Sequence, residues 1–169
     1  MTNFRPLHVV ARGLAAGIVG TACMTALQEV MARRRRRAVA MGHPVEDIDP
    51  WERAPAPAKL ARMVTERALH RDIPAERIPF FTNAVHWAFG IQMGIVFVLA
   101  ETVSRGRPAL RGPLFGLAVW AQSYATLVPL GLYKWPWQYR AGAIAKDVSY
   151  HLLYGTGTAA GYELFARKR

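Results

Sequence analysis

Two histidines stand at matching places in two apolar stretches of the chain, and they are its strongest candidates for chemistry. His86 and His151 each begin the pattern His-x-x-aromatic-Gly. A polar residue lies about one helical turn before each of them, Asn83 before His86 and Asp147 before His151. Such a partner can accept the second ring N–H and fix the tautomer, as metal-binding histidines require. These four residues therefore form the predicted ligand site, with His86 and His151 as candidate metal ligands.

The glycine that follows each histidine by four residues favours one cofactor in particular. Gly90 and Gly155 lie on the same helix face as their histidines and leave room for a flat ring. Two facing histidines with such neighbours could hold haem b, and the alternative is that each merely bonds a neighbouring helix. Zinc spacings, phosphate-binding glycine loops and nucleophile elbows are absent from the sequence, so no enzyme is indicated by motif.

Four apolar stretches must position these residues. They cover residues 13–31, 79–100, 113–133 and 144–165. At about 1.5 Å per residue, each comes close to spanning a bilayer core of about 30 Å. The sequence therefore predicts an all-α fold, an integral membrane four-helix bundle that forms a single domain over residues 1–169. The fourth stretch is the most polar, and a soluble or interfacial segment is its alternative.

The ends of these stretches carry recognisable signals. Five consecutive arginines, Arg33–Arg37, should stop the first helix at the headgroups. Pro129 should kink or end the third helix near its carboxyl end. The loop over residues 38–78 contains a helical period from 58 to 69, which predicts an amphipathic helix on the membrane or across the end of the bundle. Its apolar face would be formed by Leu60, Met63, Val64 and Ala68.

Charge is distributed as in a membrane protein. The chain has 22 Lys and Arg against 11 Asp and Glu, a formal net charge of +11, and its basic residues lie between the apolar stretches. This arrangement argues against nucleic acid as the partner and favours anionic lipid headgroups. The arginine run places the first loop on the cytoplasmic side, with both termini outside.

Small residues recur at helical spacing and predict close helix packing, either within the chain or with a second copy or another membrane protein. The first and third stretches both begin Gly-x-x-x-Gly, and the second and fourth share the histidine pattern, which together suggest two helix pairs in tandem. The expected packing positions are Gly13, Gly17, Gly90, Gly94, Gly112, Gly116 and Gly155.

Three features together resemble a known family. They are the G-L-x-A-G-x-x-G-T-A opening at 13–22, the proline-rich loop and the H-W-x-F-G start at His86. In these the chain resembles the YagU-like bacterial inner-membrane proteins, over most of its length. The resemblance implies a multi-span protein of the bacterial inner membrane and an association with tolerance of acid stress. It implies no activity and no catalytic residues, and the run Arg33–Arg37 has no counterpart in the family pattern.

Three functions follow as hypotheses. The first is a non-enzymatic accessory, scaffold or envelope-stress component that packs through its glycines. The second is a haem- or metal-binding bundle that uses His86 and His151. The third is a small transporter or proton path that adds Glu29 and Glu163 to these histidines.

Overall fold

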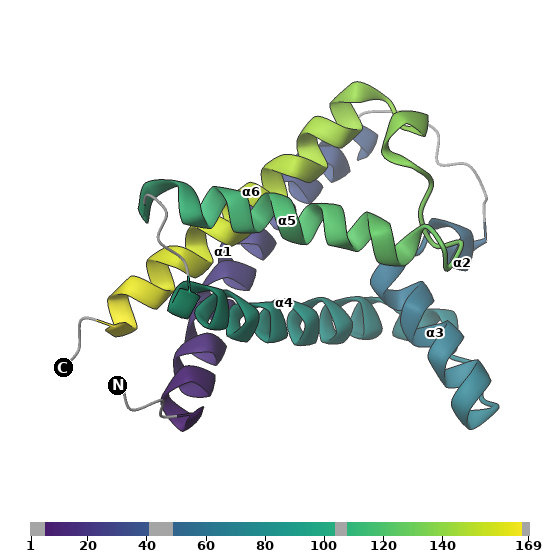
Figure 1. Ribbon diagram of the computed structural model, residues 1–169. Helices are drawn as coiled ribbons and strands as arrows, with labels where there is room; N and C mark the ends of the chain where they lie inside the picture. Colours follow the sequence, from purple (N-terminus) through teal and green to yellow (C-terminus); the bar gives the residue numbers. More distant parts are fainter. Residues whose placement is uncertain (1–5, 41–48, 104–107, 167–169) are drawn as a thin grey trace.

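The computed structural model describes residues 6–40, 49–103 and 108–166, and these residues form helices and no strands. The long helices form one group, and shorter helices lie beyond one end of it (Figure 1). The elements are α1 (Pro6–Ala40), α2 (Pro50–Arg53), α3 (Ala56–Leu69), η1 (Ala75–Arg77), α4 (Ile78–Val103), α5 (Pro108–Leu127), η2 (Pro136–Gln138) and α6 (Ala141–Ala166).

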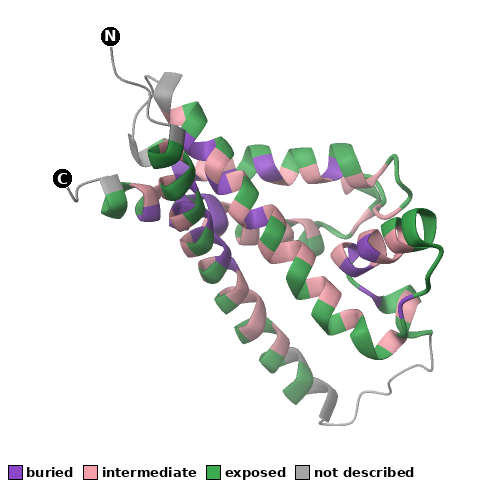
Figure 2. Ribbon diagram, turned by 90° about the horizontal axis from the view of Figure 1, so that it is seen from below, coloured by how far each residue is buried: buried purple, intermediate pink, exposed green. Residues whose placement is uncertain are grey.

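The long helices pack in the order α4, α1, α6, α5, and α3 packs on α4. The start of α1 and the end of α6 lie on one side, while α4 begins and α5 ends on the opposite side, next to α2 and α3 (Figure 1). The side chains of Met24, Val119 and Tyr154 form the buried core between α1, α5 and α6. Exposed residues cover much of the remaining helix surface, as Figure 2 shows.

Glycines lie where the long helices approach most closely. A Cβ placed on Gly17 would lie 2.8 Å from the backbone oxygen of Gly90, and one on Gly13 would lie 2.5 Å from the Cα of Ile95. The contact between α5 and α6 is similar, because a Cβ on Gly112 would lie 2.9 Å from the backbone oxygen of Gly155. All seven predicted packing glycines lie at these two contacts, Gly13, Gly17, Gly90 and Gly94 between α1 and α4, and Gly112, Gly116 and Gly155 between α5 and α6.

The first helix does not end where its sequence suggested. The arginine run was expected to stop it near Met31, but α1 continues to Ala40, so that prediction is wrong. Arginine is a good helix former. The carboxylate of Glu29 also accepts hydrogen bonds from Arg33 and Arg36 at 2.8 Å each, along one side of the helix. The arginines therefore extend the helix instead of ending it.

The third stretch ends earlier than its apolar composition suggested. Residues 113–133 were expected to form one span, but α5 ends at Leu127, two residues before Pro129. Proline cannot continue a helix, so the effect predicted for Pro129 is confirmed. The chain then turns through Gly131 at φ 72°, and the backbone oxygen of Leu127 accepts hydrogen bonds from the amides of Leu132 and Tyr133.

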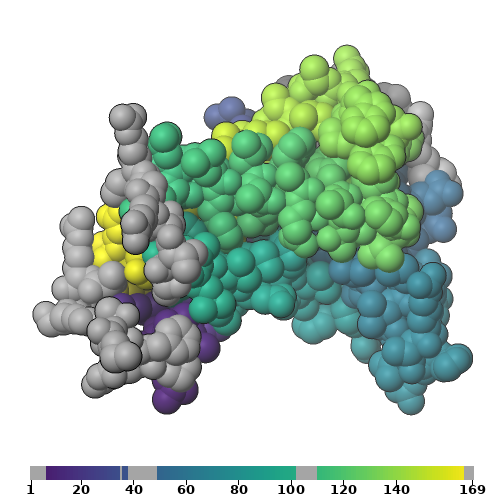
Figure 3. Space-filling view, in the orientation of Figure 1, coloured from purple at the N-terminus to yellow at the C-terminus, as the bar shows by residue number. Residues whose placement is uncertain are grey.

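The predicted amphipathic helix in the first loop is α3, which projects beyond the other helices in Figure 3. Its buried face consists of Ala56, Ala58 and Ala61, whereas the side chain of Val64 is 53% exposed. Of the expected apolar face, Leu60 and Met63 are half-buried, whereas Val64 and Ala68 are exposed, so that face is not the one packed in the bundle. Small alanine side chains form the inward face because they let α3 approach α4 closely.

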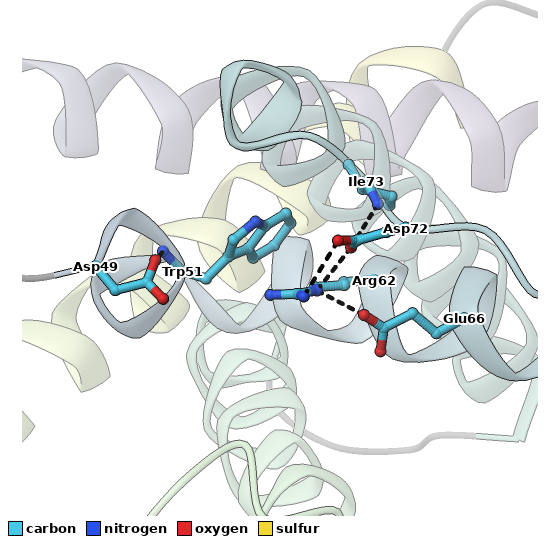
Figure 4. A network of polar contacts seen from close by, with 6 residues as sticks. All are labelled: Asp49, Trp51, Arg62, Glu66, Asp72 and Ile73. Carbon is cyan, nitrogen blue, oxygen red and sulfur yellow. Dashed lines mark hydrogen bonds and ion pairs between the residues drawn. The ribbon is translucent and has the colours of Figure 1, made fainter.

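A polar network holds α2 against α3, as the close view in Figure 4 shows. The guanidinium of Arg62 lies 4.7 Å from the centre of the Trp51 ring, a cation–π contact. Its Nε also lies 2.7 Å from a Glu66 carboxylate oxygen and 3.1 Å from one of Asp72. The hydrogen bond with Glu66, followed by the charge of Asp72, raises the pKa of Arg62. The contact between Trp51 and Arg62 therefore joins the segments on either side of residues 54–57.

Candidate functional site

A cavity of about 650 Å³ opens between the helices at the end where α4 begins and α5 ends. All four long helices contribute to its walls, and residues 54–57 together with Leu132, Tyr133 and Tyr139 form its rim. The surface of its walls is mostly apolar, although about half of the lining residues have polar side chains. Cavities of this size and character are the usual form of small-molecule sites in proteins.

Both predicted histidines line this cavity, His86 from α4 and His151 from α6. The Nε2 atom of His86 is buried and has no hydrogen-bond partner among the described residues. The Nδ1 atom of His151 lies 2.9 Å from the backbone oxygen of Asp147. A carbonyl oxygen can only accept, so Nδ1 of His151 carries the proton in this contact. In the neutral ring, Nε2 of His151 is consequently a hydrogen-bond acceptor.

The carboxylate of Asp147 also lines the cavity, and α5 fixes its position. Its Oδ2 atom accepts hydrogen bonds from the indole N–H of Trp120 at 3.0 Å and from the hydroxyl of Tyr124 at 3.1 Å. Its Oδ1 atom lies 3.7 Å from Nδ1 of His151, beyond hydrogen-bond reach. The predicted pairing of Asp147 with His151 is thus made through the backbone carbonyl of Asp147.

Asn83 lines the cavity but does not hold the ring of His86 in the way its spacing suggested. Its side-chain amide donates a hydrogen bond of 2.9 Å to the backbone oxygen of Pro79, one turn earlier in α4. This contact uses the donor end of the amide, and no hydrogen bond joins Asn83 to the ring of His86 among the described residues. The prediction that Asn83 orients His86 is therefore corrected.

The described residues contain no group of three or more His, Cys, Asp or Glu side chains that could hold a metal ion. His86 and His151 thus lack the third protein ligand that a non-haem metal site would need. Glu29 and Glu163, which the transporter hypothesis adds to the two histidines, do not line the cavity.

Three tyrosines, Tyr133, Tyr139 and Tyr154, also line the cavity. Tyr154 donates a hydrogen bond of 2.6 Å to the backbone oxygen of Gly90 and so joins α6 to α4 at the cavity wall. Burial, and then the charge of Asp147, raises the pKa of Tyr133 to about 12. The hydroxyl of Tyr139 accepts a hydrogen bond from the backbone amide of Lys134. No periodicity in the sequence shows that the turn after α5 folds back over the cavity.

Comparison with known proteins finds no relative of this chain. The sequence matches no protein-family model and no curated protein, and the fold matches no solved structure. The resemblance to the YagU-like family stays a prediction.

Proposed function

We propose that this chain is an integral membrane protein. Two described stretches, Leu7–Arg34 and Ala75–Glu101, are long and apolar enough to cross a membrane. Only 33% of the first and 22% of the second is buried inside the fold, whereas a core helix of a water-soluble protein is mostly buried. Large apolar side chains such as Ile18 on α1 and Val96 on α4 face outward instead. Lipid is the environment that such surfaces favour.

In this proposal α5 and α6 complete a four-helix membrane bundle. Leu114 on α5 and Leu164 on α6 are also exposed, at 60% and 61%. The basic end of α1 supports a cytoplasmic location for the first loop in a bacterial inner membrane, where it would meet anionic headgroups. Pairing with a second copy or with another membrane protein would use the same outward helix faces.

Extraction of isolated membranes with alkaline carbonate tests the membrane assignment. We expect the protein to stay in the membrane pellet, because carbonate removes peripheral proteins and leaves spanning helices in the bilayer. A peripheral protein bound only through its arginines would be released by the same treatment. Recovery of the chain in the supernatant would therefore refute the assignment.

The function that the cavity supports best is non-enzymatic binding of a small, largely apolar molecule. The observation that carries it is the cavity of about 650 Å³ among the four long helices, whose surface is mostly apolar and includes His86 and His151. A small molecule would bury its apolar part against residues such as Phe89 and Val119. A polar group on it would meet hydrogen-bonding side chains of the lining such as Ser123 and Asp147.

Binding of the uncharged dye Nile red to the protein in nanodiscs tests this function. Ser123 lines the cavity from α5, and Ser123→Phe should fill part of the space and lower the dye affinity about tenfold or more. Ala125 is exposed two residues later and does not line the cavity, so Ala125→Phe is the matched control and should bind dye normally. Equal binding by both variants, measured by dye fluorescence, would refute the proposal.

A second candidate is haem b held between the two histidines. The arrangement that favours it is the hydrogen bond from Nδ1 of His151 to the backbone, since iron-ligating histidines are commonly held in this way. Purified protein carrying haem would show a Soret band that is lost in both His86→Ala and His151→Ala. That spectrum would replace the proposed ligand with haem, whereas a featureless spectrum from protein expressed with ample haem leaves the cavity to a different molecule.

A further inference from the structure

The charge of the cavity is opposite to the charge of the chain. The protein carries 22 Lys and Arg and a net charge of +11. The described lining of the cavity nevertheless contains no Lys or Arg, and its one formally charged side chain is Asp147. With neutral histidines the cavity therefore has a charge of −1, which favours a cation over an anion or a neutral molecule.

Two residues of the cavity lining, Asp147 and His151, offer hydrogen-bond acceptors. The neutral ring of His151 offers the lone pair of Nε2, because its Nδ1 proton is directed to the backbone oxygen of Asp147. The ionised carboxylate of Asp147 can only accept hydrogen bonds. Its hydrogen bonds from Trp120 and Tyr124 are both made to Oδ2. Its Oδ1 therefore retains capacity for a further donor. Acceptors gathered in this way favour a ligand that brings N–H or O–H donors.

Aromatic rings add to this preference. Phe89, Tyr133, Tyr139 and Tyr154 all line the cavity, and Tyr133 and Tyr139 lie against Tyr124, with ring centres 5.1 and 6.3 Å apart. The faces of such rings carry partial negative charge and attract ammonium groups. The same faces repel an anionic head group.

We infer that the cavity binds a protonated amine with an apolar body, whose ammonium group lies between the Asp147 carboxylate, Nε2 of His151 and the tyrosine rings. The inference rests on the proposed function, because it specifies the class of molecule that this same cavity takes. The apolar body packs against the part of the cavity wall formed by Met24, Phe89 and Val119.

Three probes that share one apolar body and differ in head group test the inference: naphthylmethylammonium, naphthylmethanol and naphthoate. Each is titrated against Nile red bound to the protein in nanodiscs of phosphatidylcholine, a lipid without net charge that does not itself concentrate the amine. We expect the ammonium to displace the dye at a concentration about tenfold or more below that of the alcohol. The carboxylate should be the weakest competitor. Tighter competition by the alcohol or the carboxylate would overturn the inference.

The variant Asp147→Asn tests whether the Asp147 carboxylate causes the preference for the ammonium probe. The asparagine oxygen can still accept a hydrogen bond from Trp120 or Tyr124, and retained Nile red binding reports that the cavity is intact. We expect this variant to lose the preference for the ammonium, while Glu163→Gln, which removes an acid from the same helix outside the cavity, keeps it. Undiminished preference in Asp147→Asn would refute the assignment.

The ranking of the three probes on the unsubstituted protein decides the inference even if a variant fails to fold. Loss of Nile red binding to the cavity would refute the proposed function instead, so the two failures are distinguishable.

Discussion

Gly94→Ala is expected to lower the free energy of unfolding by about 3 kcal/mol or more, because overpacking against backbone has no easy relief. A Cβ at position 94 would overlap the backbone oxygen of Gly13 and the backbone of Gly17, at the contact of α4 with α1. Side chains can change rotamer to relieve such overlap, but these atoms belong to a helix backbone. The two helices must therefore separate, and the small-residue contact that favours their association in lipid is lost.

The measurement is the midpoint of thermal unfolding in detergent, followed by circular dichroism. Gly142→Ala is the matched control, because a Cβ at that position of α6 would meet nothing within 4 Å. Alanine is the better helix former, so the control should be unchanged or gain about 0.5–1 kcal/mol. Equal midpoints for the two variants would show that the close contact of α1 with α4 does not stabilise the protein.

Glu101→Ala is expected to cost about 2–4 kcal/mol, since it removes one partner of a mostly buried ion pair. A Glu101 carboxylate oxygen lies 2.5 Å from Nη1 of Arg111, and the two side chains are 8% and 28% exposed. This pair joins the end of α4 to the start of α5, at the end of the bundle away from the cavity. Its loss should loosen α5 while the cavity lining remains in place.

An exposed ion pair provides the control for this variant. Glu29→Gln weakens the contacts of Glu29 with Arg33 and Arg36, whose side chains are 70% and 66% exposed, and should leave the unfolding midpoint unchanged. The double variant Glu101→Leu with Arg111→Leu should recover much of the lost stability, because no buried charge remains. A midpoint for Glu101→Ala equal to that of Glu29→Gln would contradict the prediction.

Much of the local structure could be read from the sequence because it depends on neighbouring residues. Long apolar stretches predicted helices that the structure has as α4 and α6, and Pro129 marked where α5 stops. The arginine run led to a wrong prediction of the end of α1. A run of charges indicates where a helix leaves the bilayer, but it does not indicate where the backbone hydrogen bonds of the helix end. The ion pairs of Glu29 with Arg33 and Arg36 lie within one helix, and their spacing alone could have indicated that the helix continues.

The candidate site could be predicted only in part from the sequence. His86 and His151 could be singled out because ionisable groups in apolar stretches are unusual, and both do line the cavity. Tyr133 and Tyr139 could not be singled out in the same way. Aromatic residues beside Lys134 give the same sequence pattern whether they face lipid headgroups or a cavity. Asn83 was misassigned because a spacing of one helical turn does not show which way its side chain turns, and its amide donates to the backbone oxygen of Pro79.

By itself the sequence determined which segments are helical and which residues are small enough for close helix contact, because both depend on residue type and on spacing along one helix. Only the tertiary structure decided that the turn after α5 and residues 54–57 line the same cavity as the histidines. It also decided that the carbonyl of Asp147 sets the tautomer of His151 and that no Lys or Arg enters the described lining. These facts depend on which helices are neighbours and at what angle they cross, and a pattern within one helix carries no information about either.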